Sequence, residues 1–320
     1  MSSGRCRDAY GEPARAPPGP ASSAAAVAHT LSAAPDTIAR VSSHTNAEEA
    51  RARFAALAAE PEHAIDLGLG ALLIAAEERP GQVDVEAGLA RLDALARDAA
   101  PSVALAPDAR GQVLALTRHL FEVEGFEGDR ERYDDPRNSH LDQVLDRRRG
   151  LPITLAVVLV EVARRLDVPL VGVAFPAHFL VRHRELDLVL DPFDGGRELG
   201  PDDCQAILAR LAAPVTFDRG LLTPARPRDV LARMLRNLKA SHLRRGQLET
   251  ALRSVERILL LRPDDLDETR DQGLLRALLR RWGPAQDDLA RYIAARPHAP
   301  DGGEVRARLA SVRQALWQLN

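Results

Sequence analysis

The sequence predicts an α+β protein with a helical N-terminal lobe, a core made of one buried helix on a small antiparallel sheet, and a helical repeat tail. Residues 154–166 are apolar nearly all round a helix, which is typical of a buried helix. After Pro169 the pattern changes to short runs rich in β-branched and aromatic residues, and a helix followed by consecutive strands favours the α+β class. Two alanines 34 residues apart, Ala251 and Ala285, indicate a repeat in the tail.

The chain divides by composition into three expected parts. Residues 1–45 are rich in Ala, Pro, Ser and Gly and carry no periodic apolar face, so they cannot bury enough surface to offset chain entropy and we expect disorder. Residues 46–222 form the main domain, including the helical lobe. Residues 223–320 form the helical repeat domain.

The N-terminal lobe is expected to hold four helices. The first places Phe54, Leu57 and Ala58 on one face, and the others cover residues 64–77, 85–97 and 109–121. Breaks that each contain a proline, at residues 79–81 and 100–102, are expected to separate them.

A short helix is expected to lead into the buried one. Residues 122–137 have the composition of a loop, and Ser139 with Asp142 three positions on resembles a capping box that opens this helix. Gly150 is the expected residue just past its end. Pro152 then stands in the first turn of the buried helix, where its missing N–H costs nothing.

Three strands are expected after the buried helix, at residues 170–175, 179–182 and 186–190, connected most simply as an antiparallel meander. A further helix is expected at residues 202–211. It places Cys204 on one face with Ile207, Leu208 and Leu211, so we expect a packed structural cysteine.

The tail beyond about Arg226 is expected to be helical. Pro263 and Pro297 repeat the 34-residue spacing of the alanines, which is the period of the tetratricopeptide pattern. Lys239 and Arg280 stand where that pattern has glycine, so the repeats are degenerate, and a pair of unrelated helical hairpins is the alternative. A final helix is expected at residues 305–317.

Composition excludes several classes of function. The formal net charge is -3, so no strong field of one sign would recruit nucleic acid or anionic lipid, and we expect neither as a partner. No apolar run reaches the roughly 18 residues that span a bilayer. The two cysteines, Cys6 and Cys204, do not make a disulfide framework, so we expect a cytoplasmic protein.

One constellation in the middle of the chain carries the chemistry. Gly150, Leu151 and Pro152 precede the buried helix, His178 starts a strand, and Asp191 ends the next one. A papain-like or transglutaminase-like site is assembled in this way: a nucleophile at a helix N-terminus, a histidine that takes its proton, and an acid that fixes the imidazole tautomer.

Four runs in and around this constellation resemble the signature of the bacterial SirB regulatory family, a branch of the transglutaminase-like superfamily. They are YDDPRNSHLDQVLDRRRGLPITL at residues 133–155, ARRL at 163–166, FPAHFLVR at 175–182 and LDPFDGG at 190–196. The similarity covers roughly residues 65–315. It implies a transglutaminase-like core with a tetratricopeptide-like tail and a regulatory role.

The resemblance also gives a register for the site. Active members of the superfamily have Gly-x-Cys, then a helix that ends in an Arg-x-Leu-Gly-Ile-Pro-like turn, then His-Ala-Trp and Asp-Pro. Counting back from the turn at residues 165–169 puts the cysteine position on Pro152, while His178 matches the histidine and Asp191 the acid. Phe179 and Leu180 replace the Ala-Trp that follows the histidine.

Proline cannot act as the nucleophile, because it offers neither a nucleophilic atom nor a backbone donor for an oxyanion hole. Thr154 lies two residues on, about 200° around the helix, so it should not face His178. We therefore expect a non-catalytic transglutaminase-like protein that acts as a regulatory or protein-interaction module.

Alternatives remain open from the sequence. His178 and Asp191 could serve as a general-base pair of a cysteine-independent hydrolase or transferase, retain peptide or amide substrates without turnover, or form only a structural pair. A protein or peptide partner is expected at the helical repeats or at the pseudo-active cleft. The candidates for lining that cleft are Asn138, Thr154, Phe175, Pro176 and Phe193.

No cofactor is expected, and no metal. The histidines His140, His183 and His242 lack a ligand-like spacing with cysteine or carboxylate partners.

Overall fold

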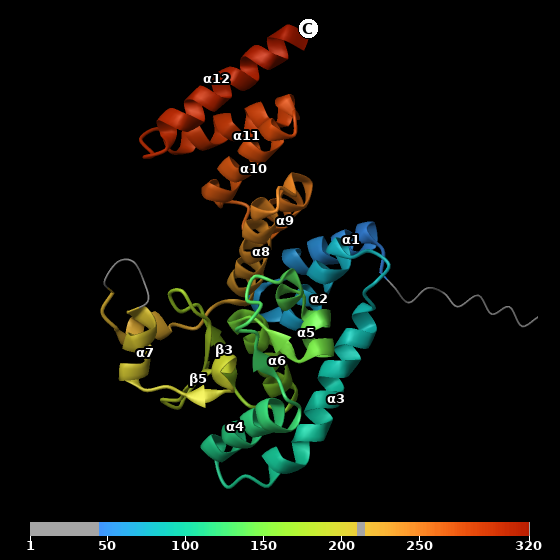
Figure 1. The fold of residues 1–320 in the computed structure, drawn as a ribbon, viewed down its shortest axis with the longest axis vertical. Coiled ribbons are helices and arrows are strands. Elements are labelled where there is room, and N and C mark those ends of the chain that lie inside the picture. The colour runs from blue at the N-terminus through green and yellow to red at the C-terminus, as the bar shows by residue number, and fades with distance from the viewer. Residues whose placement is uncertain (1–44, 210–214, 320) are drawn as a thin grey trace, which may run out of the picture. The chain divides into compact units, whose positions relative to one another are not determined.

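The computed structural model describes residues 45–209 and 215–319 of the chain (Figure 1). The expected disordered segment over residues 1–45 therefore lies outside the described residues, except for Thr45. Within the described part, helices dominate and one four-stranded sheet is present, which confirms the predicted α+β class.

Helices of the N-terminal lobe begin where the sequence supplies a capping side chain. The lobe contains α1 (Ala47–Ala59), α2 (Leu67–Glu78), α3 (Val85–Ala104) and α4 (Ala109–Arg118), which continues into the π-helical turn η2 (His119–Val123). Asn46, Asp66, Asp84 and Asp108 each accept a hydrogen bond from the backbone N–H three residues on. These bonds satisfy one of the free donors at each helix start.

Two predicted helix limits in this lobe are wrong. The third helix does not break at Pro101 but continues through it to Ala104. Ala99 and Val103 on either side are buried, so packing of the last turn outweighs the backbone hydrogen bond that proline cannot donate. The second helix begins at Leu67, because residues 62–64 form a separate 3₁₀ turn.

The approach to the buried helix also differs from the prediction. A 3₁₀ turn, η3 (Pro136–Ser139), precedes α5 (Leu141–Arg147), whose N-cap is His140, so the capping box at Ser139 is wrong. The left-handed residue that ends α5 is Arg148, with φ 60°, and not Gly150.

Gly150 is instead needed for close packing. It lies in the short strand β2 (Arg149–Gly150), which pairs in parallel with β1 (Glu127–Gly128). A Cβ atom on Gly150 would lie 2.7 Å from the hydroxyl oxygen of Thr154. A side chain there would displace the head of the buried helix.

The buried helix α6 (Pro152–Arg165) packs on one face of the sheet. The strands β3 (Leu170–Val173), β4 (Leu180–His183), β5 (Val189–Asp191) and β6 (Arg197–Glu198) are antiparallel and pair in chain order, which confirms the meander and adds a fourth strand. Val181 and Leu190 join the main core with α6, whereas Leu180 and Val189 point to a second cluster beneath α7 (Pro201–Leu208). Alternate residues of the sheet thus serve two cores. The predicted end of α7, Leu211, lies outside the described residues.

The tail consists of two helical hairpins and a final helix. Its members are α8 (Pro227–Arg244), α9 (Leu248–Leu261), α10 (Leu266–Leu278), α11 (Trp282–Ala295) and α12 (Gly302–Leu319). The turns inside the two hairpins use equivalent left-handed residues, Gly246 with φ 68° and Arg280 with φ 59°, which are 34 positions apart. The spacing read from the sequence therefore corresponds to a structural repeat.

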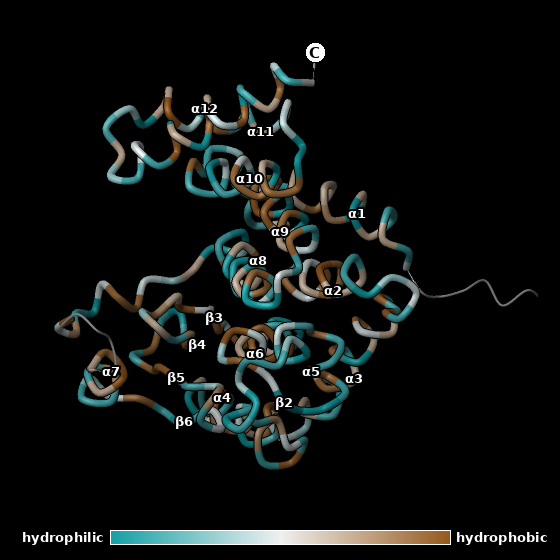
Figure 2. The backbone as a smooth tube through the Cα atoms, turned by 45° about the horizontal axis from the view of Figure 1, so that its top comes forward, coloured by the Kyte–Doolittle hydropathy of each residue, from teal (hydrophilic) through white to brown (hydrophobic). Residues whose placement is uncertain are grey.

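The first hairpin belongs to the main core and the second has its own. α8 packs against α2 and α6, and α9 against α1. Figure 2 shows hydrophobic residues gathered along α2, which these neighbours cover. A separate apolar cluster joins α10, α11 and α12, with Ala285, Leu289 and Val312 fully buried in it. None of the described helices is long and apolar enough to cross a membrane.

Candidate functional site

His178 and Asp191 form a hydrogen-bonded pair. His178 lies in the turn before β4 and Asp191 is the last residue of β5, so neighbouring strands bring them together. The distance from His178 Nε2 to Asp191 Oδ1 is 2.8 Å, and the same oxygen accepts a hydrogen bond from the backbone N–H of Phe193. Because Nε2 is engaged by the acid, Nδ1 is the ring nitrogen available to another group.

Little of this pair reaches solvent. The His178 side chain is 11% exposed and that of Asp191 is 9% exposed. The ring of Phe193 meets the imidazole edge-on, with the ring centres 6.1 Å apart, and Tyr133 in turn meets Phe193 edge-on at 5.8 Å. The guanidinium of Arg130 lies 5.2 Å from the centre of the Phe193 ring. Aromatic side chains therefore cover one side of the imidazole.

Arg233 of α8 fixes the turn that carries His178. Its guanidinium donates to the backbone carbonyls of His178, at 2.7 Å, and of Phe175, at 3.2 Å, and lies over the ring of Phe179. Burial lowers the pKa of this arginine from its ordinary value. Ala177 within the turn has a left-handed φ of 55°, a conformation that these contacts help to hold.

Pro152 is the first residue of α6 and is buried. The N-cap residue Leu151 donates its backbone N–H to the hydroxyl of Thr154, at 2.9 Å, and that hydroxyl donates to the carbonyl of Asn138, at 2.8 Å. The Asn138 carboxamide donates to the carbonyl of Arg132. These bonds tie the preceding loop to the head of α6.

Most of the predicted cleft-lining residues lie beneath the surface. Asn138, Thr154 and Phe175 are fully buried, and Phe175 packs against Phe217 in the second cluster. Pro176 is partly exposed, as is Phe193. Phe193 lines a hollow of about 310 Å³ together with residues 127–131.

A smaller hollow, of about 170 Å³, lies beside the head of α6. Core residues on its wall include Tyr133, Ser139 and Leu151, and α8 contributes Asn237 and Ser241. Burial raises the pKa of the Tyr133 hydroxyl. The first tail helix is thus part of the wall of this hollow.

Cys204 is placed as the sequence predicted, in the interior. It is 1% exposed and packs in the cluster beneath α7. Burial raises the pKa of its thiol, so it is held in the unreactive protonated form. Cys6 lies outside the described residues.

The sequence did not reveal a buried ionic cluster between the core and the tail. Glu78 of α2 accepts hydrogen bonds from His140, His242 and Arg257, which are far from it in sequence. No sequence motif predicts this cluster, since each of its members, taken alone, is an ordinary residue of a helix or of a helix end. Within residues 45–209 and 215–319, no group of three His, Cys, Asp or Glu side chains is arranged to hold a metal ion.

Comparisons with known proteins agree with both halves of the fold. A model of the transglutaminase-like superfamily matches residues 86–236, and a tetratricopeptide repeat model matches residues 238–310. A UPF0162 protein of Xylella fastidiosa is 39% identical over 79% of this chain and 92% of its own length. Protein SirB1 of Salmonella typhimurium is 31% identical over 70% of this chain and 83% of its own. The UPF0162 protein YchA of Escherichia coli is 32% identical over 66% and 82%. No solved structure matches.

Proposed function

The chain belongs to the family of the UPF0162 and SirB1 proteins, which has a transglutaminase-like domain and tetratricopeptide repeats, and we propose that it is a non-catalytic member that binds a partner protein in a regulatory role. In this proposal Pro152 occupies the position of the catalytic cysteine, and His178 and Asp191 are the retained base and acid. The proposed limits of the domains are residues 46–222 and 223–320, and the proposed location is the cytoplasm.

One observation carries the proposal: the His178–Asp191 pair is hydrogen-bonded, and the segments that follow its two members, β4 and residues 192–194, pack against a helix whose first residue is a proline. The pair has the order that acyl transfer requires, with the acid orienting the imidazole. Acyl transfer also requires a nucleophile at the helix head, and Pro152 has none. The buried, protonated Cys204 in another cluster cannot substitute for it.

The second hairpin and α12 are the proposed partner surface of the tail, because the first hairpin is packed against the core. Leu278 at the end of α10 is 54% exposed and Trp317 of α12 is 81% exposed. Large apolar side chains in such positions are available to another protein.

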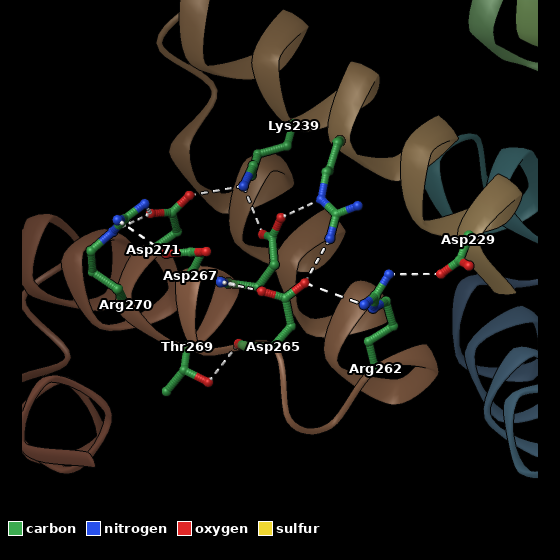
Figure 3. A network of polar contacts seen from close by, with 10 residues as sticks. Asp229, Lys239, Arg262, Asp265, Asp267, Thr269, Arg270 and Asp271 are labelled. Atoms are coloured by element: carbon green, nitrogen blue, oxygen red, sulfur yellow. Dashed lines mark hydrogen bonds and ion pairs between the residues drawn. The ribbon is translucent and has the colours of Figure 1, made fainter. Parts of the chain in front are cut away.

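A bound acidic peptide is disfavoured on the face where α8 meets α10, since the cations there already have partners. Figure 3 shows Lys239, the only lysine of the chain, between two carboxylates. Its Nζ lies 2.6 Å from Glu268 and 2.8 Å from Asp271, and Arg236 pairs with Glu268 and Asp265.

A second candidate function is a cysteine-independent hydrolase or transferase that uses His178 and Asp191 as a general base on water. The 2.8 Å contact favours it. The small exposure of both side chains disfavours it, because water and substrate must reach the free imidazole nitrogen.

Affinity capture from bacterial lysate, with the intact mass of each captured protein measured before and after incubation, separates the two functions. The baits are the wild type, His178→Ala and Leu278→Glu. A non-catalytic module leaves the partner's mass unchanged, and loss of capture by one variant identifies the surface used. A mass change produced by the wild type and abolished in His178→Ala would establish the enzyme instead.

A further inference from the structure

The ionic cluster around Glu78 joins α2, the head of α5, α8 and α9 at the junction of core and tail. Glu78 of α2 is 3% exposed, and its Oε2 accepts from His140 Nε2 at 2.9 Å and from His242 Nε2 at 3.2 Å. Its Oε1 accepts from Arg257 of α9 at 2.8 Å. Removing charges from water is costly, so a cluster this deep constrains the docking of the tail.

The geometry at His242 indicates an imidazolium. Its Nδ1 lies 2.8 Å from the side-chain oxygen of Gln247, while its Nε2 faces the carboxylate of Glu78. With the Gln247 amide oxygen placed toward Nδ1, both partners are acceptors and both ring nitrogens donate, which is the arrangement of a protonated ring. One ring thereby bonds the core through Glu78 and the turn between α8 and α9 through Gln247.

The other charged groups near His242 come from four elements. α2 also contributes Glu77, which pairs with Arg51 of α1 at 3.0 Å. His140 stands at the head of α5, and its Nδ1 is buried without a partner. Arg257 of α9 is fully buried between the two glutamates. The two glutamates thus face two arginines and two histidines. Histidine is the residue type here that changes charge near neutral pH, and His242 is the histidine that lies on the tail.

The same helix holds the remnant site at its other end. His242 lies in the last turn of α8, and Arg233, about two and a half turns earlier, donates to the carbonyls of Phe175 and His178. A helix transmits a shift of one end to the other because its backbone bonds keep it rigid.

We propose that α8 is a proton-dependent latch: protonated His242 holds the first tail hairpin against α2 and, through Arg233, keeps the His178 turn in place, and its deprotonation loosens both. This inference goes beyond the proposed function, because it holds whether or not the chain turns over a substrate.

The direction in which the stability of the latch changes with pH follows from the pKa shifts of His242 and Glu78. Burial alone would lower the pKa of His242, but Glu78 raises it above the ordinary 6.5, so its contribution is complete below 6.5 and is lost as the pH rises through the raised pKa. Burial alone would raise the pKa of Glu78, but His140, His242 and Arg257 hold it well below 4.5. Its contribution is complete above 4.5 and lost only in stronger acid. The latch is therefore tightest between about 4.5 and 6.5.

Hydrogen exchange of the full chain tests the latch. Protection factors, corrected for the intrinsic pH dependence of exchange, are measured for α8 and for residues 175–179. The two conditions are pH 6.0, about half a unit below the ordinary histidine pKa, and pH 8.5, about two units above it. The wild type is expected to lose protection in both segments at the higher pH while β3 keeps it. His242→Gln is expected to show the lower protection at both pH values. His298→Gln, at an exposed histidine of the tail, is the matched control and should behave as the wild type.

Gln247→Glu provides a second, independent arm if His242→Gln fails to fold. A carboxylate at this position favours the imidazolium, so the loss of protection should move to higher pH. Protection that does not change with pH in the wild type would overturn the latch. So would a His242 imidazole that titrates below its ordinary value in an NMR experiment.

Discussion

Thr154 shows how one hydroxyl can set the head of a buried helix. It accepts from the N–H of Leu151 and donates to the carbonyl of Asn138, and it is fully buried. These groups are buried, so water does not replace a lost bond, and without the hydroxyl only the longer 3.3 Å bond from the Leu151 N–H to the Asn138 carbonyl would remain. The loop that brings Asn138 to the site depends on this contact.

Thr154→Val should lower the free energy of unfolding by about 1–3 kcal/mol, because valine keeps the shape of threonine but leaves the Asn138 carbonyl with a weaker set of donors. Urea unfolding followed by circular dichroism measures the change. Thr223→Val is the control, since the Thr223 hydroxyl is exposed and water can replace its single bond to Gly220. An equal loss in both variants would show that the bond to Asn138 has no special weight.

At the scale of elements, a group of ion pairs between α8 and α10 connects the two tail hairpins. Glu268 is 4% exposed at its side chain and receives Arg236 and Lys239 from α8. The second hairpin has its own apolar cluster, so these ion pairs add to the contacts that align it with the first.

Glu268→Ala should weaken the second hairpin rather than the whole fold. We expect a loss of about 1–3 kcal/mol, because two partly buried cations each lose a carboxylate. Hydrogen exchange should show faster opening of α10 to α12 and unchanged protection in α6.

Glu249→Ala is the matched control for that prediction. It removes an exposed pair with Arg281 in the same tail, and such pairs contribute at most about 1 kcal/mol. Faster exchange in α6 as well as in α10 to α12 of Glu268→Ala would contradict an effect confined to the second hairpin.

At the scale of the whole described chain, the first hairpin is part of the core. Arg257 of α9 is fully buried. Its guanidinium donates to the carbonyl of Ile74, at 3.1 Å, and to the Glu78 carboxylate. Separating the tail from the core would therefore expose charged groups that are now buried, on the tail and on the core alike.

Arg257→Met should destabilise the full chain by about 3–5 kcal/mol, because it leaves Glu78 and Glu77 buried with less positive charge nearby. Thermal and urea unfolding measure the loss. Arg253→Met, on an exposed position of the same helix one turn earlier, should change stability little.

Removing the charge of both Glu78 and Arg257 distinguishes the contribution of their ion pair from that of side-chain packing. The double variant Glu78→Gln with Arg257→Met should recover part of the stability that Arg257→Met loses, since the unpaired carboxylate is gone. Additive losses in the double variant would contradict a direct interaction between the two side chains.

The sequence predicted the elements whose causes are local. The apolar faces of α6, the strand runs after Pro169 and the 34-residue spacing each follow from a repeated pattern, and the structure has the expected elements there. The continuation of α3 through Pro101 could not be predicted, because burial of its last turn decides it and burial depends on tertiary contacts. The start of α5 at His140 could not be predicted either, because it too depends on tertiary contacts.

The candidate site was predictable only where a family pattern exists. The matched motifs gave His178 and Asp191, and the two lie in hydrogen-bond contact. Arg233 and the Glu78 cluster have no local signature, since their partners are 55 to 179 residues away in the chain. Only the fold reveals that the tail supports the site.

The most direct test of the account is the reactivity of a thiol at residue 152. In a Cys6→Ser background, Pro152→Cys should react with iodoacetamide faster than Ile153→Cys. In the proposed register a thiol at residue 152 lies at the helix head and within reach of His178, and both would lower its pKa. The buried Cys204 serves as an internal reference in peptide mass spectrometry. Adding His178→Ala should remove the advantage of Pro152→Cys. Equal rates for Pro152→Cys and Ile153→Cys, with no effect of His178→Ala, would contradict the assignment of Pro152 to the nucleophile position.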